Sequence, residues 1–207
     1  MSSTRDVNNK YWDEKLETMP RAELEKKQLE DLQEIVKFAY ENAPYYKRSF
    51  DEAGVKPEDI KTLSDIQKFP FINKTTQRDT QGVGSFLGEL AAVPEEDVVF
   101  ISTSSGSTGV PTMSPFTKKD FDEFQDTESR WFWQVGMRPN DRYVHALNFS
   151  LYVGGPDVIG AQNLGALCIW GGTLPSERLL FILKTYQPTI IWTSPSYAWQ
   201  LGEKAKK

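Results

Sequence analysis

Residues 166–193, ALCIWGGTLPSERLLFILKTYQPTIIWT, contain a complete strand–helix–strand pattern. The runs Ala166–Trp170 and Thr189–Thr193 are short and almost wholly apolar, which predicts buried strands. Between them, leucines recur on one side of a predicted helix, Ser176–Tyr186. Because a helix joins the two apolar runs, this stretch predicts parallel strands with a helix packed on the sheet.

The same alternation extends upstream of this stretch. An apolar run at Tyr143–Leu147 predicts another strand, and a helix bounded by glycine is expected at about residues 155–164. Further upstream, the run VVFIS at Val98–Ser102 predicts a short strand. Thr117 and Asp120 form a capping box that opens a helix with phenylalanines on one face. The predicted fold class is therefore α/β, with a mostly parallel sheet and flanking helices.

A helical N-terminal region precedes the alternating part of the chain. Apolar residues recur at helical spacing across Glu23–Ala43, and Pro44 is expected to stop that helix. Ser64 with Gln67 indicates a capping box at the start of a second, short helix. Residues 1–10 are polar and predict a disordered start.

Charge and composition exclude several classes of function. The chain carries a net charge of -5, so it lacks the basic surface that nucleic-acid binding requires. No apolar run approaches the roughly 20 residues of a membrane span. Cys168 is the only cysteine and His145 the only histidine, so neither an intrachain disulfide nor a zinc site within the chain is expected. We expect a cytoplasmic protein with no nucleic-acid or membrane partner.

The segment Ser102–Thr112, STSSGSTGVPT, carries the most chemical information. It follows a predicted strand directly and combines hydroxyl residues with glycines. Glycines allow a positive φ and the close approach of a ligand, and successive backbone N–H groups in such turns bind anions. The pattern therefore predicts a loop that wraps phosphate oxygens. The expected phosphate contacts are Ser104, Ser105, Gly106, Ser107, Thr108 and Gly109.

Two common nucleotide-binding motifs and a plain linker fit this loop less well. No Gly-Lys-Ser/Thr follows, so the loop is not a Walker A loop, and it also lacks the G-x-G-x-x-G pattern of dinucleotide-binding folds. A flexible Ser/Gly linker has a similar composition. Linkers seldom lie between a buried strand and a well-capped helix, which favours a phosphate-binding loop.

The loop resembles the phosphate loop of the adenylate-forming superfamily, whose general form is hydroxyl-Ser-Gly-Ser/Thr-Thr-Gly-x-Pro. Further segments sharpen the resemblance to the phenylacetate–CoA ligase family. They are Asn42–Lys47, Leu63–Ile66, Phe69–Phe71, Asn73–Thr75, Leu151–Gly155, Trp170–Gly172 and Thr193–Tyr197. On this resemblance, residues 1–75 are a helical N-terminal region, and residues 76–207 are the first α/β subdomain of an adenylation domain with the phosphate loop at 102–112.

The resemblance implies an AMP-forming acid–thiol ligase. Enzymes of this family join a carboxylate to ATP, release pyrophosphate, and transfer the acyl group from AMP to the thiol of coenzyme A. The resemblance therefore implies ATP, Mg²⁺ and coenzyme A as cofactors, and an aryl acid of the phenylacetate type as substrate. It places Phe149, Tyr152, Gly154 and Gly155 near the acyl pocket, although Phe149 and Tyr152 could equally be core aromatics. It assigns no catalytic residue and no protein metal ligand within this chain.

Two departures from the family pattern matter. Many members carry a lysine in or just after the loop, where this chain has Val110 and Thr112. The phosphate charge must then be met by the backbone, by Mg²⁺ or by residues outside the loop. Such ligases are also considerably longer, so we expect an N-terminal part that does not form acyl-CoA alone. Two alternatives stay open: an adenylating enzyme for another acid or cofactor, as in the coenzyme F390 synthetases, and a nucleotide-binding or interaction module without turnover.

A few other residue types have a structural and a functional interpretation. His145 lies in an apolar run and is either a buried core histidine or a group behind the acyl pocket. Cys168 lies in a predicted strand and is expected to be unreactive. Trp131 and Trp133 flank Phe132 and indicate core packing or a dimer surface, which keeps a homodimer as an option.

Overall fold

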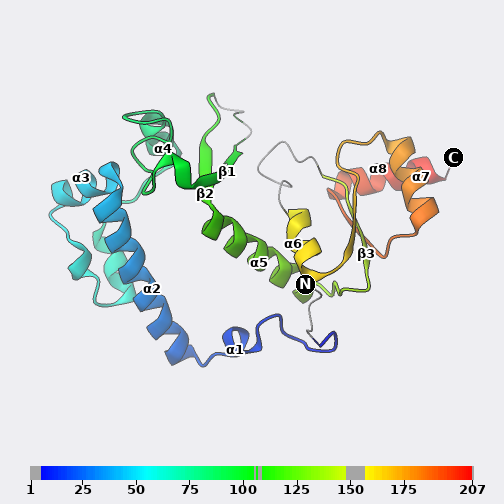
Figure 1. Ribbon diagram of the computed structural model, residues 1–207, viewed down its shortest axis with the longest axis horizontal. Helices are drawn as coiled ribbons and strands as arrows, with labels where there is room; N and C mark the ends of the chain where they lie inside the picture. The colour runs from blue at the N-terminus through cyan, green and yellow to red at the C-terminus, as the bar shows by residue number, and fades with distance from the viewer. Residues whose placement is uncertain (1–5, 105, 107–108, 148–156, 207) are drawn as a thin grey trace. The chain divides into compact units, whose positions relative to one another are not determined.

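The computed structural model describes residues 6–104, 106, 109–147 and 157–206 (Figure 1). The chain divides into two compact units. We call Thr18–Lys119 the hairpin unit, and Met1–Glu17 together with Asp120–Lys207 the sheet unit. These units do not divide at residue 75, and the domain organisation expected from the sequence stays a prediction.

Helices make up most of the hairpin unit. Helix α2 spans Arg21–Asn42 and confirms the helix predicted across Glu23–Ala43. It ends where Ala43 adopts an extended backbone, with φ -104° and ψ 116°, because a following proline disfavours the helical conformation. Pro44 then lies in the first turn of α3, Pro44–Ala53, so it ends one helix and also starts the next.

The capping box predicted at Ser64 and Gln67 is wrong. Thr62 lies at the N-cap instead, and its N–H and hydroxyl donate to the Asp65 carboxylate at 2.7 and 2.9 Å. A carboxylate is a stronger acceptor than the amide of Gln67 because it carries a charge. The short helices of this unit are η1 Pro57–Asp59, η2 Leu63–Lys68, α4 Lys74–Thr80 and η3 Glu95–Asp97.

A small core holds these helices together. It is formed by Val36, Phe50, Ile60 and Phe69, which are all buried. The rings of Phe50 and Phe69 meet edge to face with their centroids 4.9 Å apart. The Gln33 side chain donates a hydrogen bond to the carbonyl of Ile60 at 2.8 Å, which ties the segment before η2 to α2.

The strand predicted at Val98–Ser102 is confirmed as β1, Val98–Thr103. It pairs antiparallel with β2, Met113–Thr117, in a separate two-stranded sheet. The sequence did not predict β2, because Pro115 lies inside it and proline argues against a strand. Pro115 is tolerated because it lies opposite Ile101, where the antiparallel alternation turns its nitrogen, which carries no hydrogen, to the outer edge.

The sheet unit contains a parallel sheet with the strand order β4-β3-β5. The strands are β3 Arg142–His145, β4 Leu167–Trp170 and β5 Ile190–Trp192. Both outer strands pair parallel with β3. The predicted α/β fold class is confirmed. The prediction that the two outer strands are buried is wrong, because Leu167, Trp170 and Ile191 are exposed on these edge strands.

Two described helices of the sheet unit precede its strands, and one helix follows each strand along the chain. They are α1 Glu14–Glu17, α5 Lys118–Gln134, α6 Asp157–Leu164, α7 Ser176–Tyr186 and α8 Pro195–Ala205. The bounds of α7 match the prediction, whereas α8 was not predicted. Ser194 caps α8 by accepting from the N–H of Tyr197 at 3.3 Å, and Pro195 lies in its first turn. Serine followed by proline was the sequence signal for this helix.

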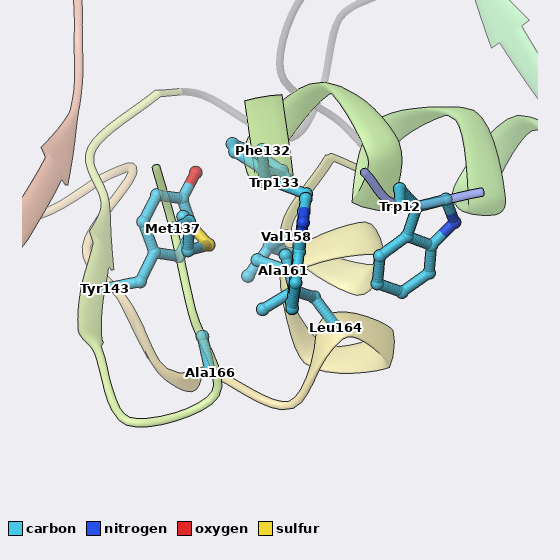
Figure 2. Packing of buried hydrophobic residues seen from close by; sticks show 9 residues of the cluster. All are labelled: Trp12, Phe132, Trp133, Met137, Tyr143, Val158, Ala161, Leu164 and Ala166. Carbon is cyan, nitrogen blue, oxygen red and sulfur yellow. The ribbon is translucent and has the colours of Figure 1, made fainter. Parts of the chain in front are cut away.

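Two cores lie on opposite faces of the parallel sheet, because successive residues of β3 point to opposite sides. Val144 packs with Leu179 of α7 and Leu201 of α8. Tyr143 packs in a larger cluster with residues of α5 and α6. That cluster consists of Trp12, Phe132, Trp133, Met137, Tyr143, Val158, Ala161, Leu164 and Ala166 (Figure 2).

Residues 6–10 of the segment predicted to be disordered are held by hydrogen bonds. The Trp133 indole N–H donates to the carbonyl of Asn9 at 3.0 Å. The Arg138 Nε–H donates to the carbonyl of Val7 at 2.9 Å. The prediction of disorder is therefore wrong for this part, because side chains far along the chain satisfy its backbone. The rest of that segment lies outside the described residues.

Gly160 of α6 provides a test of how α6 packs on α5. A Cβ added at Gly160 would lie 2.5 Å from Cβ of Glu128 and 3.2 Å from the backbone nitrogen of Ser129. We expect Gly160→Ala to lower the free energy of unfolding by about 1–3 kcal/mol, because overpacking forces the backbone to shift. Tryptophan fluorescence in urea measures this change, since every tryptophan of the chain lies in the sheet unit.

Gly202→Ala is the matched control for this substitution. Gly202 lies in α8, and a Cβ added there meets no described heavy atom within 4 Å. We expect this variant to be unchanged or more stable by up to about 1 kcal/mol, because alanine favours the helix. Equal changes in stability for the two variants would contradict the close packing of α6 on α5.

Candidate functional site

The hydroxyl- and glycine-rich segment forms the loop of the β1–β2 hairpin. The backbone N–H of Ser104 donates to the carbonyl of Thr112 at 2.9 Å, which continues the ladder beyond the register pair Thr103 and Met113. The sequence placed this loop between a strand and a capped helix. That placement is corrected, because β2 lies between the loop and α5.

The side chain of Ser104 joins the two ends of the loop, Ser104 and Thr112. Its Oγ accepts from the backbone N–H of Thr112 at 3.0 Å and from the Thr112 hydroxyl at 3.1 Å. Thr112 is buried, so its N–H depends on this acceptor. Because Oγ accepts in both bonds, the Ser104 hydroxyl can still donate its hydrogen to a ligand. A phosphate contact of Ser104 stays a prediction.

Gly106 and Gly109 shape the turn within the loop. Both have positive φ values, 66° and 133°, which favour glycine strongly. The N–H of Gly109 donates to the carbonyl of Gly106 at 2.9 Å. A Cβ on Gly106 would lie 2.8 Å from Cγ of Pro111, so this glycine is required by packing as well as by conformation.

The described residues leave space beside Gly109. A Cβ added there meets no described heavy atom within 4 Å. Glycine-rich loops bind phosphate groups because an anion can come close to a backbone that carries no side chains. A phosphate-binding role of this loop stays a prediction.

Most of the predicted contact residues lie outside the described part of the chain. Ser105, Ser107 and Thr108 of the loop belong to this group. So do the residues predicted near the acyl pocket, Phe149, Tyr152, Gly154 and Gly155. Their roles stay predictions.

Two glutamines of the hairpin unit contact the end of the loop and were missed by the sequence analysis. The side chain of Gln81 contacts Pro111 and Met113, and the Gln77 side chain donates to the carbonyl of Met113 at 3.1 Å. No local pattern indicates such contacts, because each one joins residues about thirty positions apart and depends on tertiary structure.

His145 is fully buried at the end of β3. Its Nδ1 and the Tyr143 hydroxyl share a hydrogen bond of 2.9 Å. Burial raises the pKa of the nearby Asp157 carboxyl, and the charge of His145 acts in the opposite direction. Burial also raises the pKa of Glu128, with a further contribution from Asp157. The prediction that His145 is a buried core residue is confirmed, and a role behind the acyl pocket stays a prediction.

Metal ligands and membrane spans can be sought only among the described residues. Within those ranges, no group of three His, Cys, Asp or Glu side chains could hold a metal ion. In the same part of the chain, no helix has the length and apolar character needed to cross a membrane.

Curated relatives are similar to nearly the whole chain. No family model matches it. The phenylacetate-coenzyme A ligase of Thermus thermophilus is 36% identical over 193 residues, which cover 93% of this chain and 42% of that protein. The phenylacetate-coenzyme A ligase of Escherichia coli is 37% identical over 193 residues, covering 93% and 43%. The chain therefore spans less than half the length of these relatives.

Solved structures of 2-hydroxyisobutyryl-CoA ligase share the fold. The complex with 2-HIB-AMP and CoA in the thioesterification state aligns with a TM-score of 0.89 and 33% identity, covering 98% of this chain and 45% of that one. An open conformation with 2-HIB-AMP and CoA gives a TM-score of 0.90 and 32% identity, covering 99% and 48%. These comparisons confirm the resemblance to phenylacetate–CoA ligases and related acyl-CoA ligases.

Ser104→Ala tests the closure of the loop. This substitution removes the acceptor for the Thr112 N–H, and we expect it to lower the free energy of unfolding by about 1–2 kcal/mol. Far-UV circular dichroism in urea provides the measurement. Ser64→Ala is the control, because Ser64 is exposed and does not form the capping box predicted for it. A Ser104 variant as stable as the Ser64 variant would contradict the structural role of the Ser104 hydroxyl.

Cys168 gives a prediction for the pH dependence of thiol reactivity. Burial raises the pKa of its thiol to about 11. Because the thiolate is the nucleophile, alkylation at about pH 8 should be roughly a hundredfold slower in the folded chain than in the urea-unfolded chain. The rate in the folded chain should rise as the pH approaches that pKa. Equal rates for the folded and unfolded chains would show that the thiol is not shielded.

Proposed function

We propose that this chain is the phosphate-binding part of an ATP-dependent acyl-CoA ligase that activates an aryl acid of the phenylacetate type. In the proposed reaction the carboxylate attacks the α-phosphorus of ATP and pyrophosphate leaves. The thiol of coenzyme A then displaces AMP from the acyl-adenylate and forms the thioester. The similarity to the ligases described above supports this class of reaction.

The hairpin loop is proposed to hold the β- and γ-phosphates during the first step. Its contribution is positioning and the donation of hydrogen bonds to negative oxygens, which lower the barrier without covalent chemistry. Mg²⁺, when bound, supplies the positive charge that the loop lacks at Val110 and Thr112. The contact between Ser104 and Thr112 holds the two ends of the loop together before ATP arrives.

The observation that carries this proposal is the open glycine turn at the end of a closed hairpin. Gly106 and Gly109 both have positive φ, and Gly106 is packed against Pro111, whereas no described atom lies within 4 Å of a Cβ at Gly109. Glycine turns with open space also occur elsewhere, as at Gly54, and the run of hydroxyl residues around this turn distinguishes it. The combination supports a surface that receives an anion.

The names of the relatives indicate two kinds of acid substrate. The curated relatives are named for phenylacetate and the solved structures for 2-hydroxyisobutyrate. We propose an aryl acid, with Phe149, Tyr152, Gly154 and Gly155 beside it, because of the aromatic-Gly-Gly segment in the sequence. A cytoplasmic location, a homodimer and the lack of a nucleic-acid partner also stay proposals.

The reaction is tested with a chimera in which this chain replaces the aligned 193-residue segment of the Thermus thermophilus ligase. Pyrophosphate release from ATP is measured with phenylacetate, 2-hydroxyisobutyrate and a panel of other acids, with and without coenzyme A. We expect release that depends on phenylacetate, and thioester formation when coenzyme A is added. A folded chimera that releases no pyrophosphate with any acid would contradict the proposal.

Gly109→Ala in the chimera tests the role of the loop. We expect the kcat/KM for ATP to fall about tenfold to a hundredfold, because the new Cβ enters the space proposed for phosphate and strains the turn. Gly54→Ala is the matched control, since Gly54 also has positive φ, 67°, and open space around its Cβ position. The two variants should lose similar stability in a thermal melt. Equal kcat/KM values for ATP in both variants would overturn the phosphate-binding role of the loop.

A further inference from the structure

The side-chain amide of Gln81 forms a two-point contact with the end of the phosphate loop. Its Nε2 donates to the carbonyl of Pro111 at 3.1 Å, and its Oε1 accepts from the backbone N–H of Met113 at 2.9 Å. A carbonyl can only accept and an N–H can only donate, so the two partners fix the orientation of the amide. Gln81 thus pairs with β2 as a neighbouring strand would.

This contact lies on the edge of β2 that faces away from β1. In an antiparallel ladder, hydrogen-bonded pairs alternate with pairs whose backbone groups point outward. Ser104 and Thr112 are hydrogen-bonded, so the next pair, Thr103 and Met113, turns its backbone groups outward. Gln81 satisfies the N–H of Met113 and Gln77 satisfies its carbonyl. Together these two glutamines complete the hydrogen bonding where the loop meets β2.

The segment that carries both glutamines is itself fixed in place. The side chain of Asn73 caps α4 by accepting from the N–H of Thr76 at 3.0 Å. At the other end of α4, the carbonyl of Thr80 accepts from the N–H of Glu89 at 3.2 Å. Gln81 follows directly, with an extended backbone. The segment that carries Gln77 and Gln81 is therefore held by hydrogen bonds at both ends of α4.

The contact reaches the glycine turn through Pro111. The Cβ position of Gly106 lies 2.8 Å from Cγ of Pro111, so the proline ring and the first glycine of the turn lie against each other. A hydrogen bond that holds the carbonyl of Pro111 therefore limits where Gly106 can move. A loop that is ordered before binding loses less entropy when its ligand arrives.

We propose that Gln81 is a positioning residue for the phosphate loop. It holds the outgoing strand in register and, through Pro111, keeps the glycine turn in the shape that receives the triphosphate of ATP. This inference rests on the proposed function of the loop. Gln81 does not touch the ligand, and its effect acts through the backbone that it holds.

The test uses the chain itself, with ATP and Mg²⁺ as the probe. Gln81→Met removes both hydrogen bonds and keeps a side chain of similar length. Gln33→Met is the matched control, because Gln33 also donates to a backbone carbonyl in the hairpin unit, that of Ile60, at 2.8 Å. Circular dichroism melts establish a temperature at which all variants are folded. Isothermal titration calorimetry then gives the Kd for ATP, and amide hydrogen exchange reports on the N–H of Met113.

We expect Gln81→Met to raise the Kd for ATP about tenfold and to speed exchange at Met113, because two hydrogen bonds are lost. Gln33→Met should leave both quantities as in the unsubstituted chain. Gln77→Met removes one of the contacts to Met113 and should give a smaller rise in Kd. This variant also keeps the test decisive if Gln81→Met does not fold.

The outcomes distinguish the positioning role of Gln81 from the proposed function of the loop. If the unsubstituted chain binds ATP and Gln81→Met binds it equally well, the positioning role is overturned while the proposed function stands. A rise in Kd that is equal in Gln33→Met would also overturn it, because the effect would then be general destabilisation. If the unsubstituted chain does not bind ATP, the proposed phosphate-binding function fails, and the role of Gln81 fails with it.

Discussion

Closure of the β1–β2 hairpin at Ser104 and Thr112 is the constraint on which the candidate site depends. Two antiparallel strands bring the ends of the loop together, and the Ser104 hydroxyl satisfies the buried N–H of Thr112. Between these ends, Gly106 and Gly109 both have positive φ, and the Gly109 N–H donates to the Gly106 carbonyl. The proposed chemistry then follows from shape, because a phosphate loop acts by placing donors around an anion.

The sequence predicted the sheet unit better than the hairpin unit, for physical reasons. Apolar runs such as Thr189–Thr193 supply the strands of the parallel sheet, so their composition alone marks them as strands, although the edge strand β5 is only partly buried. Met113–Thr117 has no such mark, since Pro115 and the hydroxyl residues resemble a loop, and only pairing with β1 makes it a strand. Thr62 and Ser64 both have hydroxyl groups that can cap a helix, and only the folded backbone shows that Thr62 is the cap.

The residues of the candidate site also differ in how far the sequence predicted them. The glycine turn was predictable from the sequence, because glycine adopts a positive φ more readily than other residues do. The contacts of Gln81 were not, because a side-chain amide that pairs with a distant backbone leaves no periodic signal in the chain. His145 lies between these cases: its burial follows from the apolar run around it, whereas its hydrogen bond to Tyr143 could be found only in the structure.

An amide nuclear magnetic resonance titration shows whether the hairpin loop binds the phosphates of ATP. The isotope-labelled chain is titrated with ATP and Mg²⁺ while every amide signal is followed. We expect the signals of Gly106, Gly109 and Thr112 to shift together with one Kd, and core amides such as that of Val144 not to shift. ATP binding that leaves the signals of Gly106 and Gly109 unchanged would overturn the phosphate-binding role of the loop.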